Sequence, residues 1–184
     1  MIKIMLRVKK FFPYLTFLLF LLVFLFTFLS FGLQKRTSWS TKAGEEKAQL
    51  WLLPTQVKLK QGEETEVKVF LVSRVKDVGG VDLVLKYNPI LLEVVGNTIE
   101  PGIIFNYYRD RLVDNRKGII RLSSSGNFKG EGTFATFNIK GKEIGNGKIE
   151  IVSSETSADS AVVWDSEEKG NILGNIYNLS FEVY

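Results

Sequence analysis

Apolar residues recur at every second position over much of the chain after residue 48, and this period of two limits the fold more than any other feature. Val67, Val69 and Leu71, for example, alternate with the charged Glu66 and Lys68. Successive side chains of an extended strand point to opposite faces of a sheet, so the pattern predicts strands buried on one face. The alternating segments lie at residues 67–71, 81–85, 135–139 and 177–183.

Shorter apolar pieces predict further strands, and Gly or Asn separates most of them. Gly79-Gly80 and the glycine-rich Gly126–Gly132 are expected to be connections. The second is followed by a strand pattern instead of a helix, so it is a predicted hairpin and not a phosphate loop. No helical periodicity follows the first 33 residues, and residues 49–184 are therefore expected to form one all-β sandwich. The shorter predicted strands are Leu50–Leu53, Val57–Leu59, Leu91–Val95, Ile103–Tyr107, Ile119–Leu122, Ile149–Val152 and Ala161–Trp164.

The N-terminal part of the chain is different. Residues 11–33 contain no charged side chain and are mostly Phe and Leu. A helix of that length spans roughly 34 Å, enough for a bilayer core of about 30 Å. The stretch exceeds a signal-peptide core of about 7–15 residues, and it is interpreted as an uncleaved transmembrane anchor, with cleavage near Ser30 as the alternative. Polar residues 34–48 are expected to be a linker.

The charge of the chain orients this anchor. Residues 1–10 hold four basic residues and no acidic one, which accounts for the whole net charge of +4. Basic flanks stay cytoplasmic, so residues 1–10 are the predicted cytoplasmic tail, and residues 49–184 are expected outside the cell membrane. The remainder is electrically balanced, which argues against a nucleic-acid partner. The chain has no Cys and no His, so it lacks disulfides, the usual zinc ligands and nucleophile–His pairs.

Residues 78–95 carry a family resemblance. A Gly-Gly pair precedes an alternating strand, then Tyr87-Asn88-Pro89 and a Leu92-Glu93-Val94 run. This order resembles the cohesin signature, with Asn in place of the usual Asp of Tyr-Asp-Pro. Gly132-Thr133-Phe134-Ala135 is similar to a second family segment. The Tyr-Asn-Pro segment also has a structural interpretation as a turn that ends the strand.

The resemblance implies a nine-stranded jelly-roll sandwich that binds a dockerin-like protein without catalysis or cofactor. Asp82 corresponds to an Asp with which cohesins contact the dockerin, whereas Gly80 stands where an Asn is common. By alternation Asp82, Val84 and Lys86 share one face with Gly80, which is the candidate partner-binding surface. A merely solvated face is the alternative interpretation. A polysaccharide-binding module of the same superfamily and a structural cell-envelope domain are the alternative functions.

Other side chains are candidates for ligand binding or catalysis. Four aromatic residues could stack on sugar rings, although core packing explains them equally: Phe105, Tyr107, Tyr108 and Trp164. Several carboxylates fall in expected loops without the close spacing of a calcium loop, so no metal site is predicted and a loop calcium ion stays open. Nothing fixes two carboxylates at a glycosidase distance, and the chain is expected not to be an enzyme.

Overall fold

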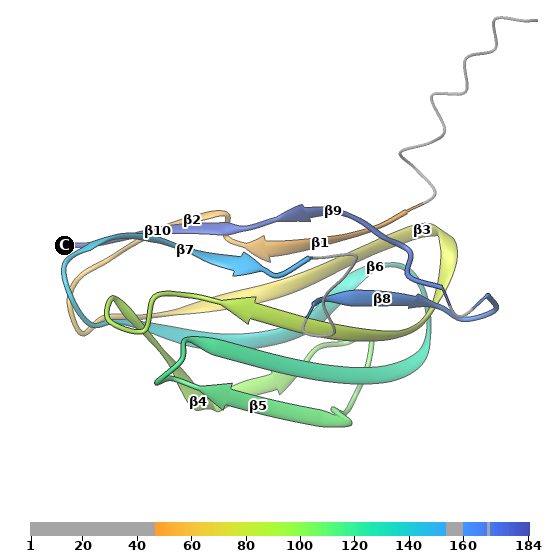
Figure 1. The fold of residues 1–184 in the computed structure, drawn as a ribbon, viewed down its shortest axis with the longest axis horizontal. Coiled ribbons are helices and arrows are strands. Elements are labelled where there is room, and N and C mark those ends of the chain that lie inside the picture. Colours follow the sequence, from red (N-terminus) through yellow and green to blue (C-terminus); the bar gives the residue numbers. More distant parts are fainter. Residues whose placement is uncertain (1–46, 154–159, 169) are drawn as a thin grey trace, which may run out of the picture. The chain divides into compact units, whose positions relative to one another are not determined.

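The computed structural model describes residues 47–153, 160–168 and 170–184. The predicted tail, the membrane span and the linker up to residue 46 lie outside them. Within the described part, no helix is long and apolar enough to cross a membrane. The regular elements there are ten strands (Figure 1): β1 (Ala48–Leu53), β2 (Gln56–Leu59), β3 (Glu64–Lys86), β4 (Leu92–Pro101), β5 (Asp110–Asp114), β6 (Ile119–Gly141), β7 (Gly145–Ile151), β8 (Val162–Asp165), β9 (Leu173–Tyr177) and β10 (Leu179–Val183).

The two longest strands, β3 and β6, pair antiparallel along most of their length and organise the fold. Their register shifts between Ser73 and Val78 and again before Gly80. Irregularities of this kind bend a strand, which lets it pass from one layer of a sandwich to the other. The predicted turn at Gly79-Gly80 and the predicted hairpin at Gly126–Gly132 are therefore wrong. Both glycine segments lie inside continuous strands, in or beside the bend.

The bend gives two layers that share β3 and β6 (Figure 1). One layer contains the first half of β3, and its strand order is β9-β1-β3-β6-β4. The other layer contains the second half of β3, and its strand order is β8-β3-β6-β5. Strand β7 pairs with the last residues of β3, β10 pairs with β7, and β2 pairs with β10. The predicted all-β sandwich is confirmed, with ten strands in the described residues where nine were expected.

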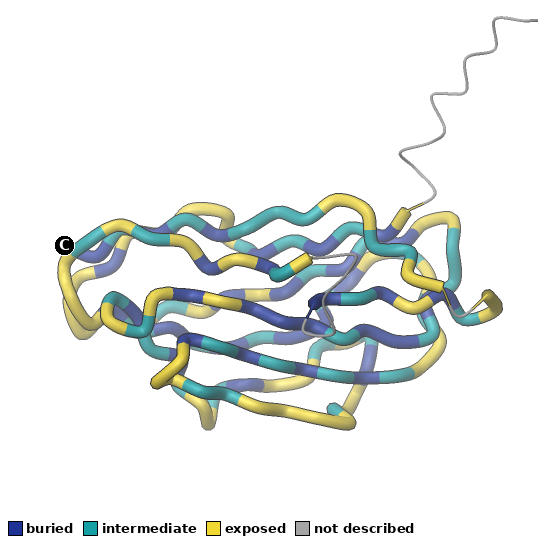
Figure 2. Tube along the Cα trace, in the orientation of Figure 1, coloured by how far each residue is buried: buried dark blue, intermediate teal, exposed yellow. Residues whose placement is uncertain are grey.

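The core lies between the layers and contains the inward residues of the alternating segments. Val67, Val69 and Leu71 are fully buried, as are Phe134 and Phe137 on β6. In Figure 2, buried positions alternate with more exposed ones along strands such as β1 and β10, as period-two strands require. Burying a side chain of this size contributes about 1.5–3 kcal/mol, so this packing stabilises a domain that has no disulfide.

One predicted strand is absent, and two strands were not predicted. Ile103–Tyr107 is an irregular segment, in which Phe105 packs edge-on against Phe134 at 6.1 Å and Ile103 is 86% exposed. Phe105 anchors this loop to the core. The apolar side chains of the segment led to the prediction of a strand. The missed strands are β9, which the expected strand at residues 177–183 overlaps only at Tyr177, and β5, which is rich in charge. Charged side chains suit a strand at the edge of a sheet, because they discourage pairing with another chain.

The predicted turn at Tyr87-Asn88-Pro89 is confirmed. The Asn88 side-chain oxygen accepts a hydrogen bond from the Ile90 amide at 3.0 Å, and its carbonyl accepts from the Leu91 and Leu92 amides. Asn closes this turn as Asp would, so the departure from Tyr-Asp-Pro leaves the geometry intact. Tyr87 is buried, and its hydroxyl donates to Asn115 Oδ1 at 2.5 Å.

Candidate binding face around Asp82

The candidate residues lie on the outer face of the β8-β3-β6-β5 layer, which we call the Asp82 face. Asp82 is the register partner of Ser123 on β6 and of Val162 on β8, so it sits in the middle of the layer. Gly80, Val84 and Lys86 occupy the same side of β3 by alternation. Leu112 on the edge strand β5 is 47% exposed.

The Asp82 carboxylate is held from both neighbouring strands. The Ser123 hydroxyl donates to Oδ1, and the Trp164 indole N–H donates to Oδ2 at 2.7 Å. A carboxylate has about four acceptor sites, so two donors leave capacity for a further one. Asp82 is therefore partly exposed, oriented in advance and still able to accept a hydrogen bond from a partner.

Gly80 lies where β3 packs closely against β6. It is the register partner of Trp164, and a Cβ at Gly80 would lie 2.9 Å from the Ser124 carbonyl oxygen. The missing side chain lets β3 and β6 pair closely at this position, because the atoms that a Cβ would meet belong to Ser124 and Ser125 on β6. Gly80 thus has a packing role, and it supplies no side chain to the Asp82 face.

Val84 and Lys86 contribute unequally. Lys86 is exposed, whereas Val84 is only 7% exposed despite its outward position. Its register partner is Arg121, and the stem of a long cationic side chain commonly covers apolar neighbours. The predicted polar–apolar–charged strip is therefore interrupted at Val84, and the accessible surface of β3 here consists mainly of Asp82 and Lys86.

A hollow of about 410 Å³ lies beside Asp82, between β8 and the bend of β3 and β6. Arg109, Ser125 and Ser166 line it together with Trp164. Sequence reasoning missed Ser123, Ser125 and Arg109. The two serines continue the outward alternation of β6 beyond Leu122, and this pattern could have identified them. Arg109 follows an irregular segment, and no periodic signal marks it.

The four aromatic candidates separate into two groups. Phe105 and Tyr108 pack on Phe134 and belong to the core, whereas Tyr107 and Trp164 are 50% and 39% exposed. The four rings therefore do not form one shared platform, because two of them pack on the core.

The loop carboxylates stabilise turns. Asp114 Oδ1 accepts from the amides of Arg116 and Lys117, and Asp165 Oδ1 accepts from those of Glu167 and Glu168. The Glu168 and Glu167 amides lower the pKa of Asp165, with a smaller contribution from Lys76. Across residues 47–153, 160–168 and 170–184, no group of three or more acidic side chains could hold a metal ion.

Comparison with known proteins assigns the chain to a family. The cohesin domain family model matches residues 51–180. This covers well over half of the chain, and the protein belongs to the cohesin family. No curated protein matched the sequence.

Solved cohesin structures share the fold at low sequence identity. A non-cellulosomal cohesin of Archaeoglobus fulgidus has a TM-score of 0.58 and 17% identity, over 75% of this chain and 91% of its own. A type II cohesin from the cellulosome of Acetivibrio cellulolyticus has a TM-score of 0.61 and 16% identity, over 73% and 95%. The third ScaC cohesin of the same organism, solved with a ScaB dockerin, has a TM-score of 0.60 and 14% identity, over 74% and 98%.

Proposed function

We propose that this protein is a membrane-anchored, non-catalytic adaptor that recruits a dockerin-like protein through the Asp82 face. The observation that carries the proposal is the Asp82 carboxylate, held by Ser123 and Trp164 with acceptor capacity left over. A group oriented before binding costs less entropy to engage than a free side chain. Membership of the cohesin family and the dockerin-bound relative support a protein partner.

The proposed partner is a module with a hydroxyl or amide donor on a helix surface. It would donate to Asp82, while Lys86 and the half-exposed Leu112 would supply charged and apolar contacts around it. A mixture of apolar and polar side chains is typical of protein interfaces. The hollow beside Trp164 would admit one projecting side chain.

The proposed location is the outer face of the cell membrane. Residues 11–33 would span the bilayer and residues 1–10 would stay in the cytoplasm, which places residues 49–184 outside. A role near polysaccharide breakdown would follow if the recruited protein is a glycan-degrading enzyme. Protease treatment of intact cells tests the topology, because residues 49–184 should be degraded while residues 1–10 stay protected.

Binding is tested with the full-length chain in detergent and purified dockerin modules of the same organism. Wild type is compared with Asp82→Ala and with Glu66→Ala, an exposed carboxylate on the same strand in the other layer. We expect at least one dockerin to bind wild type and the Glu66 variant alike. Its affinity for the Asp82 variant should fall about tenfold or more, as expected for loss of a central interface hydrogen bond. Equal binding to all three proteins would refute the assignment of the site.

A further inference from the structure

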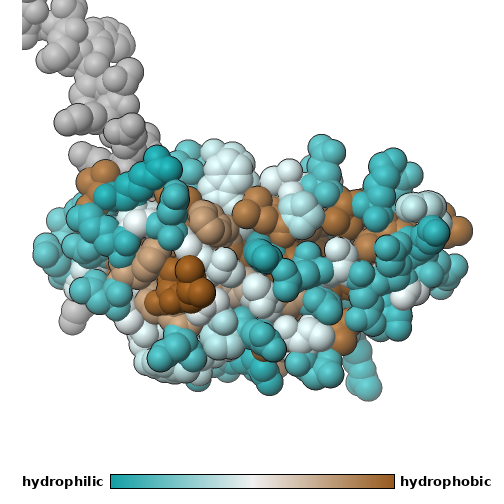
Figure 3. Space-filling model, turned by 180° about the vertical axis from the view of Figure 1, so that it is seen from behind, coloured by the Kyte–Doolittle hydropathy of each residue, from teal (hydrophilic) through white to brown (hydrophobic). Residues whose placement is uncertain are grey.

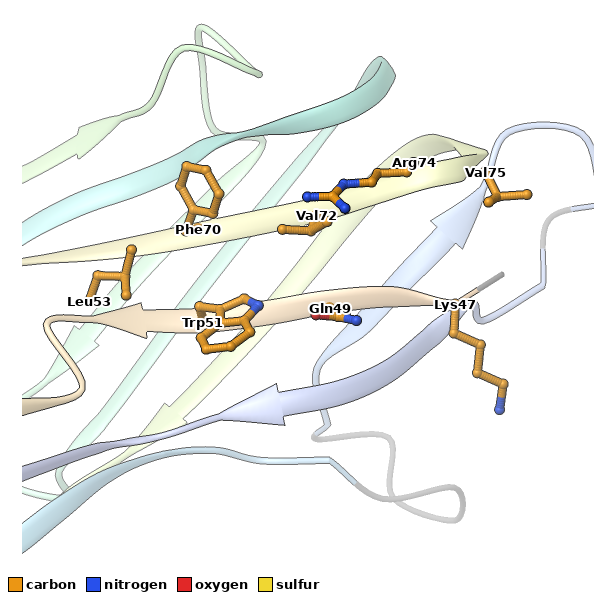
Figure 4. Close-up of a pocket in the computed structure, with 8 residues that line it drawn as sticks. All are labelled: Lys47, Gln49, Trp51, Leu53, Phe70, Val72, Arg74 and Val75. Carbon is orange, nitrogen blue, oxygen red and sulfur yellow. The ribbon is translucent and has the colours of Figure 1, made fainter. Parts of the chain in front are cut away.

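A second groove lies on the outer face of the other layer, between β1 and the first half of β3. We call it the Trp51 groove. Its apolar lining, shown in Figure 4 along the two strands, is Trp51, Leu53, Phe70, Val72 and Val75. Its volume is about 460 Å³, within the range of small-ligand sites. Seen from behind in Figure 3, apolar side chains lie exposed among the hydrophilic ones.

Aromatic rings form a row across this layer. Trp51 is the register partner of both Phe70 on β3 and Tyr177 on β9. The Trp51 and Tyr177 rings stack with centroids 3.4 Å apart and an interplanar angle of 12°. This stacking covers one face of the indole ring and restrains it. The opposite face, on the side of the groove, is available to an occupant at little further cost in entropy.

The polar lining of the groove is cationic or neutral. Lys47, Gln49 and Arg74 line it, and none of its lining residues is acidic. Arg74 lies 3.1 Å from Glu131, but both side chains are well exposed, and a surface ion pair of this kind costs little free energy to open. The guanidinium can therefore turn from Glu131 to an occupant of the groove. The groove therefore favours an occupant with negative charge and hydroxyl acceptors beside flat apolar faces.

The location of the groove argues against an extended peptide. Peptides that bind sheets usually pair with an unpaired edge strand. Here β1 lies between β3 and β9, and β3 lies between β1 and β6, so both strands are already paired. Only side chains remain for recognition, which suits stacking of sugar rings.

We propose that the Trp51 groove binds an acidic polysaccharide, in which pyranose rings pack on the aromatic row and carboxylates face Lys47 and Arg74. The groove belongs to a different layer from the Asp82 face. One domain could therefore hold a glycan and a protein partner at the same time. The glycan-binding test can fail while the dockerin-binding test succeeds, and the reverse.

The test is calorimetric titration of the full-length chain in detergent with hexagalacturonate, and with cellohexaose as the neutral probe. We expect binding of hexagalacturonate that weakens as salt is raised. Trp51→Ala should weaken it about tenfold or more, and Arg74→Ala about threefold. Asp82→Ala is the matched control on the other layer and should bind hexagalacturonate as wild type does.

Four results would overturn the proposal. These are no binding of hexagalacturonate at millimolar concentration, equal or tighter binding of cellohexaose, unchanged affinity in both groove variants, and self-association of wild type that Trp51→Ala abolishes. The last would assign the groove to a second copy of the chain. Because Arg74 is exposed, its variant tests the groove even if Trp51→Ala disturbs folding, which circular dichroism would reveal.

Discussion

The indole nitrogen of Trp164 lies 2.7 Å from Asp82 Oδ2, although the two residues are 82 positions apart in the sequence. This hydrogen bond joins β8 to β3 on the face proposed to bind a partner. Together with Ser123 it determines which way the carboxylate points. The proposed binding function therefore depends on Trp164 as a positioning residue as well as on Asp82.

Trp164→Phe should keep an aromatic ring at this position and remove the N–H donor. We expect the free energy of unfolding to fall by about 1 kcal/mol, the usual net contribution of one hydrogen bond. Urea unfolding of the full-length chain, followed by circular dichroism, measures it. Tyr107→Phe is the control, because its hydroxyl is a distant 3.5 Å from Ser125 Oγ and its loss should change stability little. Equal effects of the two variants would contradict this role of Trp164.

Gly80→Ala should destabilise the domain by about 1–3 kcal/mol, as overpacking commonly does. The added Cβ would meet the Ser124 carbonyl oxygen at 2.9 Å, so the paired strands would have to separate. Gly96→Ala is a matched control on β4, since a Cβ there meets nothing within 4 Å. Thermal unfolding of both variants measures the difference. If Gly80→Ala is as stable as Gly96→Ala, the packing role assigned to Gly80 is wrong.

Asp165→Asn should reduce the loss of stability in acid. Backbone amides hold the pKa of Asp165 below its usual range in the folded state, so its contribution is present at neutral pH. It is lost as the pH falls below about 4 and the carboxylate becomes protonated. Unfolding measured from pH 7 to pH 2 should show a flatter profile for the variant. A difference in stability between the variant and wild type that stays constant from pH 7 to pH 2 would contradict this assignment.

Tyr87→Phe should reduce the loss of stability in alkali. Burial raises the pKa of Tyr87 to about 12, so above about pH 10 the unfolded chain ionises first and folding becomes less favourable. The variant should lose about 1 kcal/mol at neutral pH with its hydrogen bond to Asn115, but it should decline less between pH 10 and pH 12. Burial also raises the pKa of Tyr108, so some alkaline dependence should remain. Parallel profiles of wild type and the Tyr87 variant between pH 10 and pH 12 would contradict this assignment.

Several features could be predicted from the sequence because they depend only on residues close together in the chain. Alternation at Val67, Val69 and Leu71 identified a core-facing strand, since a period of two decides which side chains share a face. The turn at Asn88 follows from the local hydrogen bonding of its own side chain. The same alternation placed Asp82 and Lys86 on one side of β3, and the cohesin resemblance singled out Asp82.

The remaining features depend on which strands become neighbours, and a period of two does not specify that. The glycines near residues 80 and 130 suggested turns, yet they lie in or beside the bend of two continuous strands. Only strand pairing brings Trp164 to Asp82 and Trp51 to Tyr177. The sequence by itself thus determined the β class, the inward faces and the position of Asp82. The tertiary structure decided how Asp82 is held and where the aromatic groove forms, because both arise from contacts between segments distant in the chain.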